Sequence, residues 1–270
     1  MHYNAIVKIN LVTMKNRFTC YILLATAAVT TVRCNHDDDQ GQQTTPCLPT
    51  TLPGYTSTLT ISYNADKKVS TVHYTEDDTP GYKSSYLYAN GKITRINTMQ
   101  GGVTKAYNTF TYGNGTITES HFIKVANQFE EDSRIIYYLQ GTRITAWANH
   151  NPYNKLARHD SVVFIYTGEN ITQKNSYGEG EYIENYFLYT YDTKTNPFKL
   201  AGLNDEDDEY FKPINISKNN ITRMEFHFGE HTDHDDFAYT YNTDGLPTTR
   251  AITWGGILAN PAQTISYICN

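Results

Sequence analysis

Residues 239–247 read Tyr239-Thr240-Tyr241-Asn242-Thr243-Asp244-Gly245-Leu246-Pro247. Two aromatic residues, two positions apart, precede a polar turn, and an apolar residue follows the turn. The pairs Asp-Gly and Asn-Gly supply the positive φ values that the I′ turns of β-hairpins require. Residues two apart in a strand share a face, so the two tyrosines point the same way. The stretch therefore predicts a hairpin whose first strand carries aromatic rings on one side.

This hairpin pattern returns at intervals of roughly 25 residues, which is the mark of a repeat architecture. Most copies end in Ile or Leu followed by Thr, and one partial copy has Asn-Asn in place of Asn-Gly. About eight units imply about sixteen strands, and twisted open sheets rarely exceed ~10 strands without curling. The clear copies contain Tyr86 and Tyr88, Phe110 and Tyr112, Ile136 and Tyr138, and Phe164 and Tyr166; weaker ones begin at Ile61 and Tyr189, and the partial one is Asn219-Asn220-Ile221-Thr222.

The predicted fold is all-β: a curled antiparallel β-meander of repeated hairpins, half-barrel or barrel-like. A linear solenoid of hairpins is the alternative. No linker rich in Pro and Gly interrupts the repeats, so residues 58–270 are predicted to form one domain. The aromatic stripe is interpreted as core, with Tyr rings covering one face of the sheet and their hydroxyls reaching water. The longer insertions, near 128–133, 150–160 and 204–213, are predicted as loops or edges.

The copies at 189–192 and 239–247 resemble YD repeats of the Rhs type. A further likeness, to the C-terminal signature of uncharacterised Bacteroidetes lipoproteins built from such repeats, is carried by Tyr191-Asp192, Asn196-Pro197-Phe198 and Asn219-Asn220-Ile221-Thr222. The resemblance covers nearly all of the chain after its targeting segment. It implies an all-β protein of the cell envelope, from a family without assigned activity or catalytic residues.

The N-terminus is predicted to be a signal peptide, residues 1–33, and is left out of the fold. Lys15 and Arg17 form a basic region, and Met14 is a better start of this signal than the first residue. The apolar run Phe18–Val32 is about fifteen residues long, short of the ~20 that a membrane-spanning helix needs. The segment therefore predicts export of the chain.

Cys34 follows the apolar run, and Asn-His-Asp-Asp-Asp follows Cys34. This arrangement resembles the lipidated first residue of a bacterial lipoprotein with an acidic tract for surface export. Arg33 departs from the small residue that such lipoproteins have before the cysteine, so cleavage near Ala25-Thr26-Ala27 is the alternative. Residues 34–57 are predicted to be the lipidated cysteine and a flexible tether, which anchors the protein at the outer membrane, exposed on the cell surface.

Two further cysteines, Cys47 and Cys269, would lie in an oxidising compartment after export. A disulfide between them would join the start of the domain to its last strand. Two unpaired thiols are the alternative, because spacing alone does not show that the Cβ atoms meet.

One stretch carries residues suited to a metal ion. It holds His227, His231, Asp233, His234, Asp235 and Asp236, and we expect it to link two strands. Imidazole and carboxylate groups could hold a divalent cation there, with His231, Asp233, His234 and Asp235 as the candidate ligands. A solvated acidic turn is the alternative interpretation.

Composition and motifs narrow the function. The chain has 23 Tyr and 11 Phe and a net charge of -6, without the basic stripe of a nucleic-acid-binding protein. It contains no Gly-x-Ser-x-Gly, His-Glu-x-x-His or Walker-type motif, and no cofactor is predicted. The prediction is a non-catalytic binding or scaffold protein of the envelope whose partners are the membrane, through its lipid, and a glycan or an envelope protein. The alternative is a hydrolase that acts on glycans through loop carboxylates.

Overall fold

The computed structural model describes residues 47–54, 57–76, 81–150, 158–178, 183–203 and 213–269. The predicted signal peptide and Cys34 lie outside these residues. The elements are β1 (Leu48–Pro53), β2 (Ser57–Tyr63), β3 (Val69–Glu76), β4 (Tyr82–Ala89), β5 (Lys92–Gln100), β6 (Val103–Tyr112), β7 (Thr116–Val125), β8 (Gln128–Gln140), β9 (Arg143–His150), β10 (Arg158–Thr167), β11 (Asn170–Tyr177), β12 (Ile183–Thr195), α1 (Pro197–Ala201), α2 (Pro213–Ile216), β13 (Asn219–Phe228), β14 (His231–Tyr241), β15 (Pro247–Trp254), β16 (Ile257–Thr264) and β17 (Ser266–Ile268).

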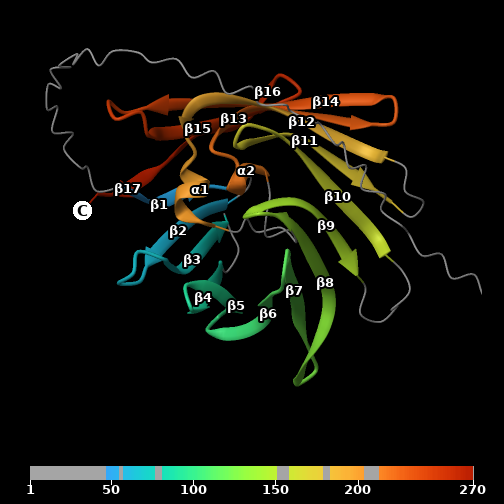
Figure 1. The fold of residues 1–270 in the computed structure, drawn as a ribbon. Coiled ribbons are helices and arrows are strands. Elements are labelled where there is room, and N and C mark those ends of the chain that lie inside the picture. Colours follow the sequence, from blue (N-terminus) through green and yellow to red (C-terminus); the bar gives the residue numbers. More distant parts are fainter. Residues whose placement is uncertain are drawn as a thin grey trace, which may run out of the picture. The chain divides into compact units, whose positions relative to one another are not determined.

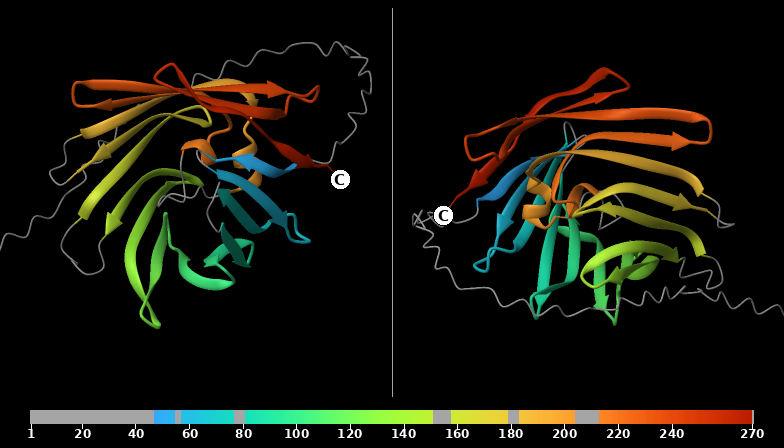
Figure 2. Two further views of the ribbon diagram at one scale, coloured as in Figure 1. Left: turned by 180° about the vertical axis from the view of Figure 1, so that it is seen from behind. Right: turned by 45° about the horizontal axis from the view of Figure 1, so that its top comes forward.

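The strands form one antiparallel meander that wraps into a nearly closed barrel (Figures 1 and 2). Each strand from β1 to β15 pairs with the strand that follows it in the sequence, and β17 pairs back with β1. The prediction of a curled, barrel-like all-β meander is confirmed, and the linear solenoid is wrong. Among the described residues, no helix is both long and apolar enough to cross a membrane.

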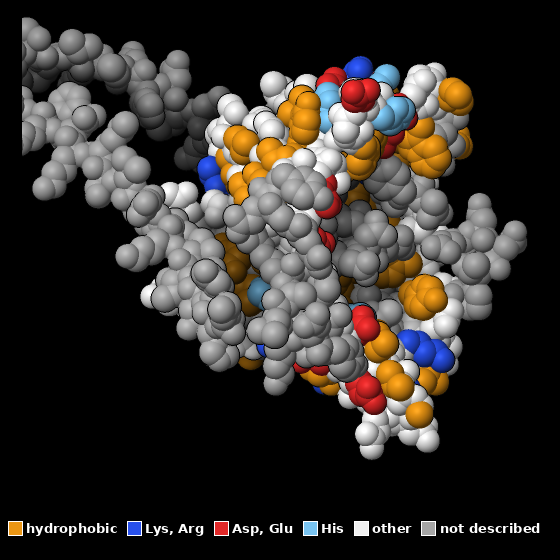
Figure 3. Space-filling model, turned by 90° about the vertical axis from the view of Figure 1, so that its right-hand side faces the viewer, with side chains coloured by type: hydrophobic (Ala, Val, Ile, Leu, Met, Phe, Trp, Pro, Cys, Tyr) orange, Lys and Arg blue, Asp and Glu red, His pale blue; other side chains and the backbone are white. Residues whose placement is uncertain are grey.

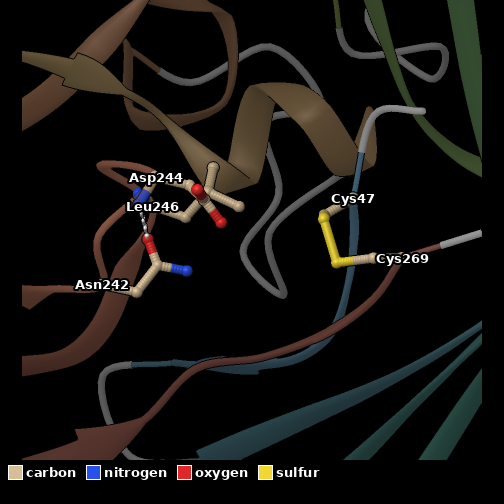
Figure 4. The surroundings of a disulfide bond; sticks show 5 residues. All are labelled: Cys47, Asn242, Asp244, Leu246 and Cys269. Atoms are coloured by element: carbon tan, nitrogen blue, oxygen red, sulfur yellow. Dashed lines mark hydrogen bonds between the residues drawn. A yellow bond between two sulfur atoms is a disulfide. The ribbon is translucent and has the colours of Figure 1, made fainter. Parts of the chain in front are cut away.

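The end of the chain closes the barrel. The strand β16 pairs with β15, whereas β17, one residue later, pairs with β1, so this last segment bridges the two edges of the meander. The backbone N–H of Ile265, between the two strands, donates to the carbonyl of Thr248 over 2.8 Å. A disulfide joins Cys47 to Cys269 at the ends of β1 and β17 (Figure 4).

The sheet begins earlier than the sequence predicts. Strand β1 lies inside the predicted tether, and Leu52 within it is fully buried. It pairs on one side with β2 and on the other with β17. The predicted loop near 128–133 is also wrong, because these residues form the first half of β8. The other two predicted insertions lie mostly outside the described residues.

Alternation along the strands turns one set of side chains into the barrel, and most of the core lies there. Tyr86, Phe110, Phe164 and Tyr189 are buried inward residues, as predicted for the first aromatic of each pair. The hairpin of β8 and β9 differs, because Tyr137 is fully buried and Tyr138 is 42% exposed. The inward side of β8 thus carries Ile135 and Tyr137, and the predicted pair Ile136 and Tyr138 faces outward.

Apart from Tyr138, which faces outward, and Tyr241, which donates to Asp192, the second tyrosine of each pair does not reach water with its hydroxyl, contrary to the prediction. Its hydroxyl donates to the backbone carbonyl of an earlier residue, in most cases the apolar residue that opens the second strand of the hairpin before it. We call these the ladder tyrosines. The bonds are Tyr63 to Pro49, Tyr88 to Val69, Tyr112 to Ile93, Tyr166 to Ile144, Tyr191 to Ile171 and Tyr267 to Pro247.

This ladder links each hairpin to the next. Burial raises the pKa of the Tyr88 and Tyr166 hydroxyls to about 12, so both keep their protons and remain donors. A cation from the preceding turn also lies over the ring in several units; the Lys92 ammonium is 4.6 Å from the centre of the Tyr112 ring. The repeated tyrosine is therefore a structural part of the fold.

We expect Tyr112→Phe to lower the free energy of unfolding by about 1 kcal/mol, because the ring remains and the bond to Ile93 is lost. Tyr138→Phe is the matched control, since that ring is half exposed on the outer side of β8. Urea unfolding of the two variants measures the difference. Equal midpoints would contradict the ladder.

The turn at Asn90 and Gly91 has positive φ at both residues, as the predicted I′ type requires, but two other turns differ from it. Gly115 and Gly245 have φ of +77° and +75°, but Asn114 and Asp244 are not among the described residues with positive φ. In the second turn, the N–H of Gly245 donates to the carbonyl of Asn242, and the Asn242 side chain accepts from the N–H groups of Asp244 and Leu246 (Figure 4). This is a three-residue loop, a type I turn followed by a left-handed glycine.

Substitution of either glycine should still cost stability. We expect Gly115→Val and Gly245→Val to lower the free energy of unfolding by about 1 to 3 kcal/mol, because a β-branched residue is strained at positive φ. Thr111→Val, at an exposed position on the outer side of β6, is the matched control. An unchanged midpoint in both glycine variants would refute this turn geometry.

The two short helices lie inside the ring of strands, between β12 and β13 in the sequence (Figures 1 and 2). Asn196 caps α1, accepting from the N–H of Phe198 and donating to the carbonyl of Ser217. Asp192 accepts from the backbone and side-chain N–H groups of Asn220 and from the Tyr241 hydroxyl. Asp192, Asn196 and Asn220 thus hold the helical segment between β12 and β13 in place. The predicted Asn-Asn turn is wrong, because Asn219 and Asn220 begin β13.

The outer side of the strands is rich in hydroxyl groups. Most core aromatic residues face inward, whereas the outer side combines polar residues with an aromatic group of Tyr107, Phe122 and Phe129. Exposed apolar residues on the outer side include Leu87, Phe129, Tyr138, Val163 and Ile165. Outward threonines include Thr60, Thr75, Thr111, Thr190, Thr240 and Thr249.

Candidate functional site

Four aromatic rings lie on the inward side of the barrel near the turns that join β13 to β14 and β15 to β16. We call Phe187, Phe226, Phe228 and Trp254 the aromatic wall. They share faces with core residues two or four positions away, among them Tyr189, Met224 and Ile252. Unlike most inward aromatic residues, Phe228 and Trp254 are 46% and 45% exposed. Exposed rings on an inner surface are available to a ligand.

The rings of the aromatic wall are held in fixed orientations. Phe187 stands edge-on to Phe226 and to Phe228, with interplanar angles of 81° and 85° and centroid distances of 5.4 and 5.9 Å. The planes of Phe226 and Phe228 are 17° apart, with centroids 6.4 Å apart. The Lys174 ammonium lies 5.2 Å from the centre of the Phe187 ring. Edge-to-face contacts of this kind stabilise ring pairs beyond simple burial.

Carboxylates stand between the rings. Strand β14 lies between β13 and β15, and it places Asp233 opposite Phe226 and Asp235 opposite Trp254. Asp235 is buried, whereas Asp233 is exposed and accepts the backbone N–H of His234 over 2.7 Å. Figure 3 shows acidic, histidine and hydrophobic side chains close together at the top of this side of the molecule. The wall therefore presents both apolar surface and hydrogen-bond acceptors.

The four predicted metal ligands do not converge. They lie in strand β14 and not in a linking turn, so His231, Asp233 and Asp235 point inward while His234 points outward. His234 lies 3.5 Å from the Asp236 carboxylate on that outer side. Within the described part of the chain, no group of three or more His, Cys, Asp or Glu residues could hold a metal ion. Because side chains alternate along a strand, His234 is separated from the other three candidate ligands.

The outward residues of this region form a network of ion pairs. Arg223 contacts Glu225 at 3.0 Å and Asp236 at 3.4 Å, and the His227 ring stacks on Tyr186 with centroids 4.2 Å apart. Partly exposed pairs of this kind contribute little to stability. The network accounts for the outer half of the predicted cluster without a ligand.

A second polar group lies inside the barrel on β6, β7 and β8. Glu119 is 3% exposed, and its carboxylate accepts from the Tyr137 hydroxyl at 2.6 Å and from the Asn108 amide. The Asn108 side chain also hydrogen-bonds His121 at 3.0 Å. Burial raises the pKa of Glu119 to about 7, although the bonds from Tyr137 and Asn108 lower it. We call these residues the Glu119 network.

A carboxyl group with such a pKa is suited to general acid catalysis. In this chain both of its oxygens are already hydrogen-bonded and the group is sealed from solvent, so we assign it a structural role. The acidic run 204–209, which a hydrolase could use, lies outside the described residues. The hydrolase alternative therefore stays a prediction.

Comparison with known proteins gives a likeness of fold. No protein-family model matches the chain, and no curated protein matches it. A porin-like protein from Bacteroides uniformis ATCC 8492 is 12% identical, with a TM-score of 0.40 over 84% of this chain and 98% of that one. A porin-like protein from Bacteroides vulgatus ATCC 8482 is 11% identical, with a TM-score of 0.38 over 84% and 99%. Likenesses at this level carry no argument about function.

Proposed function

We propose that this chain is a lipid-tethered, non-catalytic binding protein of the bacterial cell envelope that holds its ligand against the aromatic wall. The observation that carries this proposal is the exposure of Phe228 and Trp254 on the inward side of a barrel where most other inward aromatic residues are buried or half-buried. Ligand sites typically combine such apolar surface with a few polar groups. Here Asp233 and Lys174 supply those groups.

The residues on the outer side of the barrel support the proposal that the barrel is surrounded by water and attached to the membrane through its tether. The threonines and charged residues on that side suit solvent, and apolar side chains such as Leu87, Phe129 and Ile165 are exposed among them. The proposal of a lipid anchor rests on the sequence, on Cys34 and the acidic residues after it. Lipid on one cysteine and a polar barrel are compatible with display at the outer membrane.

Binding is tested by the fluorescence of tryptophan. The chain has two tryptophans, and Trp147 is only 4% exposed, so acrylamide quenching reports mainly on Trp254. Polysaccharide, lipid and protein fractions of the envelope are added in turn. We expect one fraction to protect Trp254 from quenching in the wild type and in Leu87→Ala, and not in Phe228→Ala. If no fraction protects Trp254, the proposed function is wrong.

The anchor is tested separately. Radiolabelled palmitate should enter the wild-type protein, and Cys34→Ala should abolish its incorporation and release the chain from membranes. Cys20→Ala, in the predicted signal peptide, is the matched control and should still be labelled. A mature N-terminus upstream of Cys34 would reject the lipoprotein interpretation.

A further inference from the structure

The chemistry around the aromatic wall narrows the class of its ligand. The Phe226 and Phe228 rings lie on one strand with nearly parallel planes and centroids 6.4 Å apart. Phe187 supports both from its edge, so their orientation is set before a ligand arrives. A preorganised platform reduces the entropy that binding must overcome. The ligand should therefore present flat apolar faces in succession.

The carboxylates exclude a purely apolar ligand. A lipid chain lying from Phe226 to Trp254 would cover the Asp233 carboxylate and offer it no donor beyond the backbone N–H of His234, and burial of a charge without enough hydrogen bonds is costly. Asp233 lies directly opposite Phe226, and directly opposite residues have Cβ atoms roughly 5 Å apart. A ligand stacked on this ring must donate hydrogen bonds at its edge.

The charges also disfavour strongly charged ligands. Asp233 and Asp235 would repel an anionic polymer, and the Lys174 ammonium beside Phe187 would repel a cationic one. A sugar ring meets each requirement, because it has an apolar C–H face and hydroxyl groups around its edge. Those hydroxyls donate to carboxylates and accept from an ammonium group.

We infer that the aromatic wall binds a neutral polysaccharide, with neighbouring sugar rings stacked on Phe226 and Phe228 and a hydroxyl group donating to Asp233. This inference rests on the proposed function and names the ligand of the same site. Trp254, which lies across β14 from Met224 and diagonally from Phe226, gives the polymer a further stacking surface. Stacking on several rings makes affinity depend on chain length.

Native gel electrophoresis with polysaccharide in the gel tests the inference. The probes are laminarin, glucomannan, xylan and dextran as neutral polymers, polygalacturonate as an anionic one and chitosan as a cationic one. We expect at least one neutral polymer to retard the wild-type protein. Phe228→Ala should raise the dissociation constant for that polymer about tenfold or more, as loss of a central aromatic contact does.

Two further variants control for folding. Asp233→Asn keeps the shape of the side chain and should weaken retardation while leaving the unfolding midpoint in place. Leu87→Ala, at an exposed position on the outer side of β4, should bind as the wild type does. Retardation that persists in Phe228→Ala and Asp233→Asn would overturn the inference.

The remaining outcomes separate the inference from the function. If only chitosan or only polygalacturonate retards the protein, or if no polymer does while a lipid or protein fraction protects Trp254, the inference fails and the proposed function stands. If no polymer retards the protein and no fraction protects Trp254, both fail.

Discussion

Reduction of the disulfide between Cys47 and Cys269 should lower the free energy of unfolding by about 5 kcal/mol. The two residues are 222 positions apart, so the bond closes a loop that contains the whole barrel. In the unfolded chain this loop restricts many conformations, and breaking it restores them. In the folded chain the bond holds the three-residue strand β17 against β1, where the barrel closes.

Urea unfolding with and without dithiothreitol measures this effect. The double variant Cys47→Ser and Cys269→Ser should unfold like the reduced wild-type protein and should not respond to the reductant. A thiol titration of the unreduced, denatured protein should find both cysteines unreactive. Two titratable thiols, or a midpoint that reduction leaves unchanged, would show that the bond is absent in solution.

The class of fold could be predicted from the sequence because its signals are local. Each unit combines an aromatic pair, a turn residue and an apolar residue within about ten positions, and hairpin formation needs no distant partner. Curling followed from the number of strands alone. The ladder was not predicted, although its sequence signal is visible: Tyr88 and Val69 recur as Tyr112 and Ile93.

The register of one hairpin could not be predicted from its residues. Ile135 and Ile136 are alike, and so are the neighbours Tyr137 and Tyr138, so either alternate set could face the core. A shift of one residue exchanges the two faces of a strand. The inward position of Tyr137 is set by Glu119 on the preceding strand β7, which accepts a hydrogen bond from its hydroxyl.

Strand β1 was missed for a different reason. It contains Pro49 and Pro53, which are unfavourable within a sheet, and its two partners are the nearby β2 and the distant β17. The pair Cys47 and Cys269 is a sequence sign that the two ends meet, but it does not show that the last residues pair with β1 as a strand. Contacts of such long range are determined by closure of the barrel.

The aromatic wall shows how far the candidate site could be predicted from the sequence. Phe226 and Phe228 follow the same alternation as core residues, so the sequence marks them as inward without showing which end of a strand stays exposed. The metal prediction failed because it treated β14 as a linking turn. In a strand, neighbouring ligands such as Asp233 and His234 point to opposite sides.

Glu119 should make the stability of the protein depend on pH in a direction unusual for a carboxylate. Its pKa is about 7 in the folded protein, above the value of 4.5 for the free side chain, because burial disfavours the charged form. Between these values the unfolded chain releases a proton that the folded protein retains. The free energy of unfolding should therefore fall as pH rises from about 4.5 to 7, by about 3 kcal/mol.

Glu119→Gln should remove this dependence. The variant retains an acceptor for the Asn108 amide and carries no charge, so it should be more stable than the wild type at pH 8 and similar to it at pH 4. Urea unfolding at half-unit intervals of pH gives the slopes. Glu130→Gln, at an exposed position on β8, should keep the wild-type slope, and His121→Gln separates any contribution of the neighbouring imidazole. A Glu119→Gln variant with the wild-type slope would place the titrating group elsewhere, and the Glu119 carboxyl would then be ionised inside the folded barrel.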